Sequence, residues 1–230
     1  MRHKSVLLVS TIMAGACGLG VIGNGEVTST SRPLTGFSHV TAAGSGDVHV
    51  REGGAYSVSV TTDSNLQPLI ETRVSGDTLV IDAHDLFRPT ELRIDVQLPT
   101  FRGGTLSGSG AFDAVVTSIH DLDLTLDGSG TLETTGEARA IAATLSGSGI
   151  VRLTGAAESL AALMTRSGLL DARDLTADQA TLSLAGSGGV KATVVRSVAL
   201  DLEGSGDIDW WGPAAVSSAS VGGSGQIVHH

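Results

Sequence analysis

Apolar and polar residues alternate along most of the chain. Residues 124–132 read Leu-Thr-Leu-Asp-Gly-Ser-Gly-Thr-Leu, with an apolar residue at every second position on either side of a glycine-rich step. The same alternation occurs at 56–60, 78–81 and 92–98. A period of two predicts β-strands, because successive strand side chains point to opposite faces, and it does not fit the 3.6-residue period of a helix. The pattern therefore predicts an all-β protein.

The alternation belongs to a repeat. Gly-Ser-Gly starts at positions 108, 128, 147, 186, 204 and 223, and the degenerate copy Arg166-Ser167-Gly168 fills the one gap, so that seven units follow at intervals of 18 to 20 residues. Two apolar columns accompany the units. The column two residues before each unit is Leu106, Leu126, Leu145, Met164, Leu184, Leu202 and Val221. The column four residues after each start is Phe112, Leu132, Val151, Leu170, Val190, Ile208 and Ile227.

A fixed period of this length is typical of a solenoid, in which each repeat buries its apolar side chains only against its neighbours. We expect a parallel β-solenoid with coils of about 19 residues, each made of three short strands and stacked in register about 4.8 Å apart. The bias of parallel crossovers predicts right-handed winding. The regular coils should span residues 105–228. Residues 25–104 lack the period and predict a less regular β-rich segment that leads into the stack and caps it.

The glycines of each unit allow backbone conformations, or close approaches, that a Cβ atom would forbid. Strict alternation would point the glycines inward and the serines outward, in a column along one surface. Candidate ligand-binding residues in that column are Ser129, Ser148, Ser187 and Ser205. The alternative is that the serines form a hydrogen-bonded ladder or only help to make the turn.

Residues 1–17 have the form of a signal peptide. Arg2, His3 and Lys4 precede an apolar run at 5–16, which is too short to span a bilayer and fits the hydrophobic region of an export signal. Cys17, the only cysteine, ends this run and rules out a disulfide within the chain. It is the candidate lipidation site of a bacterial lipoprotein, although Ala14 stands where such motifs usually carry Leu. The alternative is ordinary cleavage nearby, with Cys17 incidental.

The charge of the chain limits its partners. It has 24 acidic and 14 basic residues, for a net charge of −10. Nucleic acids and anionic lipid surfaces require clustered Lys and Arg, so we expect no nucleic-acid partner and no membrane contact except through a lipid anchor.

Several segments together resemble a known family. They are Arg32–Phe37, Gly44–Val48, Tyr56–Asp63, Asn65–Leu66, Leu69–Thr72, Gly76–Leu79 and Gly204–Ile208 followed by Trp210-Trp211-Gly212. In combination they look like the bacterial putative auto-transporter adhesin family with the head GIN domain, in which Tyr is more usual than Trp in the penultimate coil. The resemblance covers roughly residues 25 to 228. It implies an exported β-helical protein of the Gram-negative cell envelope, often a lipoprotein, and it supplies no catalytic or ligand-binding residues.

Catalytic chemistry is not indicated by the sequence. Acidic residues are grouped at Asp121, Asp123 and Asp127, and at Asp201, Glu203, Asp207 and Asp209, as expected for a solvated face. The histidines lack the spacing of metal ligands, and no serine is paired by spacing with a base. We therefore expect no enzyme activity, no cofactor and no metal site. Trp210 and Trp211 are further ligand-binding candidates, and alternation predicts that one faces inward and the other outward.

These observations predict an exported, adhesin-like module of the periplasm, outer membrane or cell surface that binds a glycan or another envelope protein. A carbohydrate-active β-helix enzyme and a structural or regulatory envelope lipoprotein are the alternatives. The last coil ends at Gln226–His230 without an apparent cap. We expect its unpaired backbone groups to be either shielded by a fold-back of the N-terminal segment or used for pairing with a second molecule, as a homodimer through the C-terminal edge.

Overall fold

The computed structural model of the chain describes residues 20–83 and 87–230. The predicted signal peptide and Cys17 lie outside the described residues. Strands make up 72% of the protein, which confirms the all-β class. Among the described residues, no helix is long and apolar enough to cross a membrane.

The N-terminal elements are β1 (Val21–Ile22), β2 (Val27–Arg32), β3 (His39–Gly44), β4 (Asp47–Glu52), β5 (Ser57–Asp63), the 3₁₀ helix η1 (Gln67–Leu69), β6 (Glu71–Ser75), β7 (Thr78–Asp82), β8 (Phe87–Arg88) and β9 (Leu92–Leu98). The stack continues with β10 (Gly103–Gly108), β11 (Ala111–Val115), β12 (Leu122–Gly128), β13 (Thr131–Gly147), β14 (Ile150–Arg166), β15 (Leu169–Gly186), β16 (Gly189–Gly204), β17 (Asp207–Trp211), β18 (Ala215–Gly223) and β19 (Gln226–His229).

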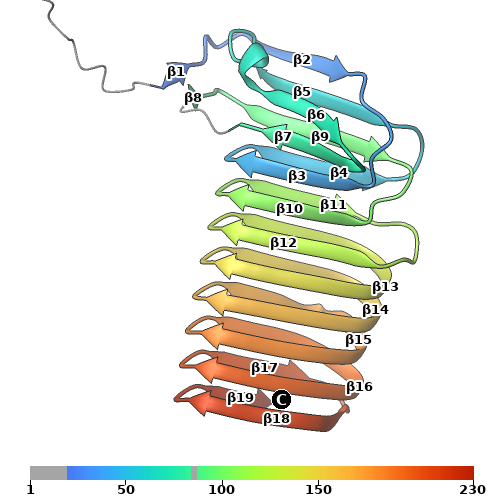
Figure 1. The fold of residues 1–230 in the computed structure, drawn as a ribbon, viewed down its shortest axis with the longest axis vertical. Helices are drawn as coiled ribbons and strands as arrows, with labels where there is room; N and C mark the ends of the chain where they lie inside the picture. The colour runs from blue at the N-terminus through green and yellow to red at the C-terminus, as the bar shows by residue number, and fades with distance from the viewer. Residues whose placement is uncertain (1–19, 84–86) are drawn as a thin grey trace, which may run out of the picture.

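The coils form a flattened solenoid with two ladders of parallel strands (Figure 1). The front ladder joins β3, β10, β12, the second halves of β13 to β16, and β18. The back ladder joins β4, β11, the first halves of β13 to β16, β17 and β19. A rounded corner connects the ladders on one side of each coil, and the Gly-Ser-Gly turn connects them on the other (Figure 1).

The core is the narrow space between the ladders. The first predicted apolar column pairs in register, as in Leu126↔Leu145 and Leu145↔Met164, and Leu145 is fully buried. The second column pairs in the same way, from Phe112↔Leu132 to Ile208↔Ile227. The predicted parallel, in-register stacking with a 19-residue spacing is therefore confirmed.

The expectation of three short strands per coil is wrong. β13 to β16 each contain 16 to 18 residues and run without interruption through the rounded corner. Most residues of such a bent strand keep their hydrogen bonds to the coils above and below, and the pairing shifts register only locally, as between β15 and β16.

The Gly-Ser-Gly unit makes the sharp turn, and it breaks strict alternation. The second glycine is buried in most units, as predicted, but the first has a positive φ, for example +142° at Gly128. The N–H groups of Ser129 and Gly130 both donate to the Gly108 carbonyl of the preceding coil, at 2.9 and 3.0 Å. A Cβ atom at Gly128 would lie 2.2 Å from that oxygen, so both the backbone angle and the close approach require glycine.

The N-terminal segment is more closely integrated than its sequence indicates. Gly44 pairs in register with Gly108, so the isolated Gly44-Ser45-Gly46 is an additional unit of the same turn. Strands β7 and β9 pair in parallel with β3 and β4 and form one more rung beyond it. The antiparallel strands β2, β5 and β6 cover this end of the stack (Figure 1).

Candidate functional site

The serine column lies at the narrow turn edge. Ser129, Ser148, Ser187 and Ser205 are all exposed. The backbone N–H of each serine donates to a backbone carbonyl of the preceding coil. Among the hydroxyl groups of these four serines, the one hydrogen bond described is that from Ser187 to Ser167, at 3.4 Å. The structure thus favours a row of exposed hydroxyl groups over a continuous hydrogen-bonded serine ladder.

The two tryptophans alternate as predicted. Trp210 is buried, with 3% of its surface exposed, and stacks on His229 with the ring centroids 3.7 Å apart. Trp211 is partly exposed and stacks on His230 with the centroids 4.5 Å apart and the rings within 10° of parallel. Only Trp211 is therefore placed to contact a ligand at the surface.

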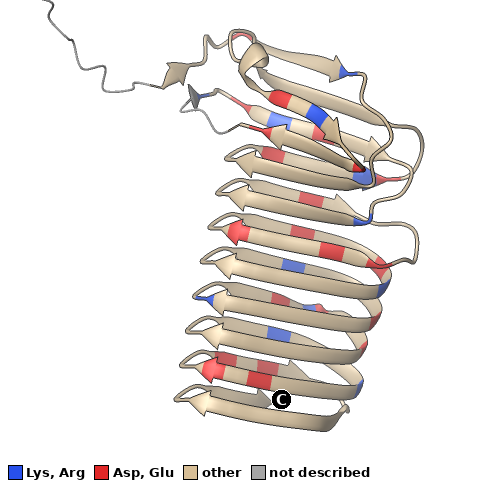
Figure 2. Cartoon of the chain, in the orientation of Figure 1, with Lys and Arg blue, Asp and Glu red and all other residues tan. Residues whose placement is uncertain are grey.

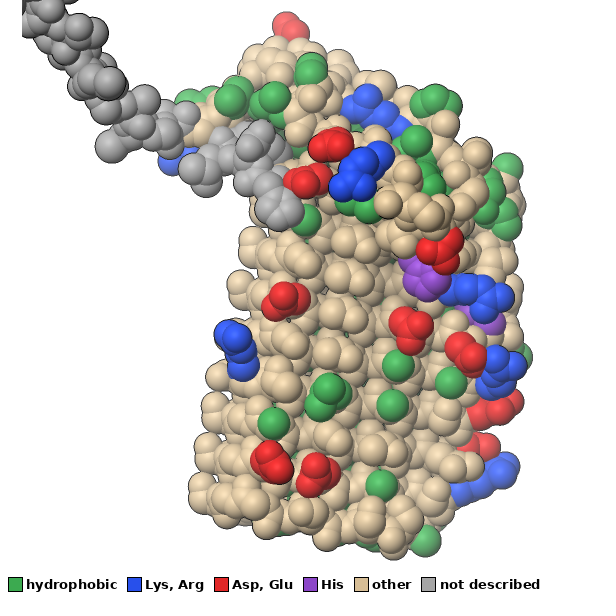
Figure 3. All heavy atoms as spheres, viewed as in Figure 1, with side chains coloured by type: hydrophobic (Ala, Val, Ile, Leu, Met, Phe, Trp, Pro, Cys, Tyr) green, Lys and Arg blue, Asp and Glu red, His purple; other side chains and the backbone are tan. Residues whose placement is uncertain are grey.

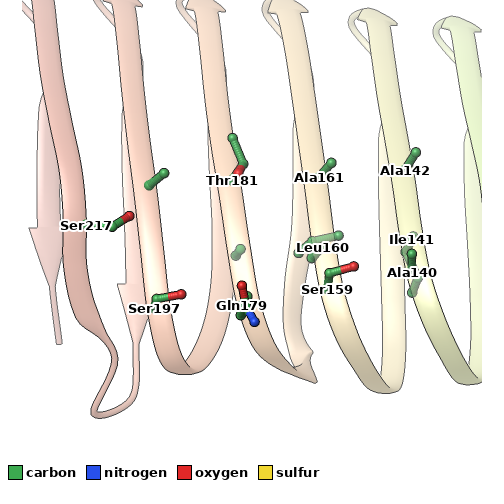
Figure 4. Close-up of a pocket in the computed structure, with 12 residues that line it drawn as sticks. Ala140, Ile141, Ala142, Ser159, Leu160, Ala161, Gln179, Thr181, Ser197 and Ser217 are labelled. Atoms are coloured by element: carbon green, nitrogen blue, oxygen red, sulfur yellow. The ribbon is translucent and has the colours of Figure 1, made fainter.

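The structure also shows a groove that the sequence interpretation missed. It runs across the front ladder from β13 to β18, next to the rounded corner, and has a volume of about 300 Å³ (Figure 4). Its lining consists of Ala140, Ile141, Ala142, Ser159, Leu160, Ala161, Gln179, Ala180, Thr181, Ser197, Ala199 and Ser217. A third apolar column, which runs through Ile141, Leu160 and Val198, lies beneath it and could have pointed to the site.

Small side chains and the absence of charge distinguish the groove. Within residues 140–147, 159–165 and 179–186 the front ladder has no charged residue, and Figure 3 shows this neutral face. Elsewhere the coils carry ion pairs between neighbours, including Arg139 with Asp121 and Arg196 with Asp178 (Figure 2). The hydrogen bond from Arg139 holds the pKa of Asp121 below its usual range. The groove itself is lined only by uncharged residues, which five successive coils contribute.

A buried carboxylate joins the N-terminal part to the stack. The Glu52 side chain is fully buried and accepts hydrogen bonds from the backbone N–H groups of Thr117 and Ser118, at 2.6 and 2.8 Å, and bonds the His120 ring at 2.8 Å. Burial raises the pKa of Glu52, but the bonds from His120 and the backbone together outweigh it and lower the pKa. We assign this carboxylate a structural role, because its oxygens are already used to hold the loop at 116–121.

Asp63 holds the cap in a similar manner. Its carboxylate accepts the backbone N–H groups of Thr90 and Gly25, each at 2.7 Å, and the Thr90 hydroxyl at 2.9 Å. The Thr90 backbone bond is the main cause of its lowered pKa. Sequence reasoning missed both carboxylates because their partners are distant in the chain. Among residues 20–83 and 87–230, no group of His, Cys, Asp and Glu has the arrangement of a metal site.

Comparison with known proteins identifies the family. The sequence model described as "Putative auto-transporter adhesin, head GIN domain" matches residues 36–214. The chain belongs to this head GIN family. The predicted resemblance is thereby confirmed, and most of the groove and both tryptophans lie within the matched residues.

Solved structures similar to this head GIN protein share its fold. A putative adhesin from Bacteroides fragilis is 22% identical, with coverage of 92% of this chain and 100% of that one and a TM-score of 0.82. A putative lipid binding protein from Parabacteroides distasonis is 22% identical, with coverage of 91% and 99% and a TM-score of 0.77. A putative adhesin from the same organism is 21% identical, with the same coverage and a TM-score of 0.74. No curated protein matches the chain.

Proposed function

We propose that this protein is an exported, non-enzymatic binding module of the Gram-negative cell envelope, anchored by lipidation of Cys17, and that the front groove binds a surface polymer or an extended segment of an envelope protein. The adhesin family supports the general class. The observation that carries the proposal is the groove itself, which crosses five successive coils without a charged residue.

The dimensions of the groove suit an extended ligand. Five rungs at the spacing of hydrogen-bonded strands give a length of about 19 Å. The hydroxyl groups of Ser159 and Thr181 and the Gln179 amide make no side-chain hydrogen bond to other described residues, so they are available to a ligand. Because these groups recur at the coil spacing, they match a chain with repeated polar groups better than a compact small molecule.

Three of the seven carboxylates considered for a carbohydrate-cleaving enzyme have partners of their own. Asp121 binds Arg139, Asp209 binds His230 at 2.8 Å, and Asp207 accepts the backbone N–H of Gln226. This usage supports a binding role over a catalytic one.

Binding of labelled residues 18–230 to envelope fractions and to a glycan array tests the proposal. Ala161→Arg and Thr181→Arg each place a long side chain in the groove, and both positions are exposed, so the fold should remain intact. We expect these variants to lose at least about tenfold in affinity, or about 1.4 kcal/mol. Ser31→Arg, at an exposed position of β2 in the N-terminal cap and outside the groove, is the control and should bind like the wild type. Equal binding by all three variants and the wild type would reject the groove as the binding surface.

Dimerisation stays a prediction. Val216 and Val221 are 50% and 54% exposed, whereas their partners Val198 and Leu202 in the preceding coil are fully buried. Light scattering across a concentration series should show dimers that Val221→Lys dissociates. A concentration-independent monomer would reject this contact.

A further inference from the structure

Two neighbouring coils differ in length. The coil from Arg166 to Gly186 contains 20 residues, and the next, from Gly186 to Gly204, contains 18. The structure accommodates the difference on the back face, where pairing between β15 and β16 jumps from Ala172↔Ala192 to Thr176↔Thr193. Arg173 and Asp174 lie in this irregularity and are exposed. The longer coil therefore forms a ledge over the shorter one, and such bulges often re-aim side chains at binding sites.

Trp211 lies beneath this ledge. It pairs with Thr193 in the coil above, and the Thr193 hydroxyl donates to the Arg173 carbonyl at 2.8 Å. Arg173 and Trp211 are two rungs apart, or about 10 Å along the stack, and the small Thr193 side chain lies between them. Arg173, Asp174, Thr193 and Trp211 line a depression of about 390 Å³.

The indole of Trp211 is fixed from its other side. Strand β19 lies on the side of β17 opposite to β16, and His230 stacks there, nearly parallel to the indole. Asp209 holds the His230 ring at 2.8 Å. The supported indole presents its remaining face toward the coil of Thr193 and Arg173, where the depression lies. A ring held in this way loses little side-chain freedom on binding a ligand.

Polar groups stand opposite the indole. The Arg173 guanidinium binds Asp171 through Nε and Nη2, at 2.9 and 2.6 Å, and Nη1 makes no hydrogen bond to the described residues. Asp174 forms no ion pair or side-chain hydrogen bond within the part of the chain that the structure describes. The depression thus combines an aromatic platform with one free donor and one free acceptor.

We propose that this depression binds one pyranose ring of a neutral polysaccharide, an inference that rests on the proposed binding function and adds a second contact to the groove. One face of a pyranose presents C–H groups, which pack against the electron-rich face of an indole. Its hydroxyl groups would donate to Asp174 and accept from Arg173. A sugar ring in van der Waals contact on both of its faces needs about 8 Å. The two-rung separation of Trp211 and Arg173, about 10 Å, provides this space. The net charge of −10 opposes a polyanion and favours a neutral saccharide.

Affinity electrophoresis in gels that contain dextran, laminarin, yeast mannan or galactan tests the proposal, followed by a titration of tryptophan fluorescence with the oligosaccharide of the retarding polymer. We expect at least one polymer to retard the wild type. Trp211→Ala should weaken binding by at least about tenfold, and Asp174→Ala by about three- to tenfold. Ile119→Ala removes an exposed apolar side chain from the loop at 116–121, which lines neither the groove nor the depression, and should bind like the wild type. Thermal unfolding checks that each variant is folded, and Asp174→Ala tests the site even if Trp211→Ala does not fold.

The outcomes separate this proposal from the more general one. Retardation of the wild type that survives both Trp211→Ala and Asp174→Ala would place the saccharide elsewhere and overturn the site. A wild type that binds envelope fractions but none of the four polymers would leave the general function standing and overturn the saccharide class. A wild type that binds neither would contradict both proposals.

Discussion

Arg166 occupies a position that the stack is built to fill with glycine. It is the one non-glycine residue with positive φ among the described residues, at 87°, and it replaces the first glycine of its unit. In the unit of Gly147, both following N–H groups donate to the preceding coil, at 2.9 and 3.1 Å. After Arg166, only Ser167 donates, to the Gly147 carbonyl, at a longer 3.2 Å. The turn therefore loses one hydrogen bond where the Cβ atom is present.

Arg166→Gly should stabilise the protein. Removal of the Cβ strain is worth about 1–2 kcal/mol, and recovery of the second hydrogen bond about 1 kcal/mol. The greater freedom of glycine in the unfolded chain costs about 0.5–1 kcal/mol. The net gain is about 1–2 kcal/mol, or an increase in Tm of about 2–8 °C for a chain of this size. Thermal unfolding followed by circular dichroism measures this shift.

Arg166→Ala is the matched control, because it removes the charged side chain but keeps the Cβ atom. Its Tm should stay close to that of the wild type. If Arg166→Ala stabilises as much as Arg166→Gly, the guanidinium and not the backbone is the source of strain. A lower Tm for Arg166→Gly would refute the reasoning altogether.

Three further predictions concern the core, pH and export. Leu145→Asp should unfold several coils, because it puts an unpaired charge into the fully buried column, whereas Ser148→Ala should change stability by no more than about 0.5 kcal/mol in denaturant titrations. The lowered pKa of Glu52 contributes stability that is present above its unfolded pKa of 4.5 and is lost as the pH falls below that value. Glu52→Gln should therefore have a lower Tm at neutral pH, and its Tm should fall less steeply than that of the wild type as the pH is lowered. An equally steep fall in both proteins would contradict this assignment. Metabolic labelling with a fatty-acid analogue should mark the wild type, and Cys17→Ser should abolish the label; an unlabelled wild type would exclude the lipid anchor.

The regular part of the fold could be predicted because each coil repeats the same local requirements. The apolar columns and the turn glycines recur at one spacing, and a period of two places Trp210 inside and Trp211 outside. The rung formed by β7 and β9 could not be recognised in the same way. This rung has no Gly-Ser-Gly unit. Its strands lie in the segment between Gly44 and Gly108, which pair in neighbouring coils although they are 64 positions apart in the sequence.

The buried carboxylates escaped prediction for a related reason. Glu52 meets His120 across 68 residues of sequence, and Asp63 meets Thr90 across 27. Neither pair follows from a local period, because each depends on how the irregular N-terminal strands close over the first coil. Alternation reports only whether a side chain points inward. It puts Glu52 on the inward face with Val48 and Val50 and would put Asp63 on the outer face, and in neither case does it identify the partner.

The candidate binding surfaces arise from two different uses of the same repeat. The groove requires neighbouring coils to be alike, since only small, uncharged residues at equivalent positions keep a channel open across five rungs. The Trp211 depression requires neighbouring coils to differ, since a 20-residue coil must project over an 18-residue one. A solenoid tolerates both because each coil depends mainly on its nearest neighbours, so a change in one coil is absorbed within a rung or two. Extended recognition can therefore come from the regular face, and discrimination between ligands from the place where a 20-residue coil is followed by an 18-residue one.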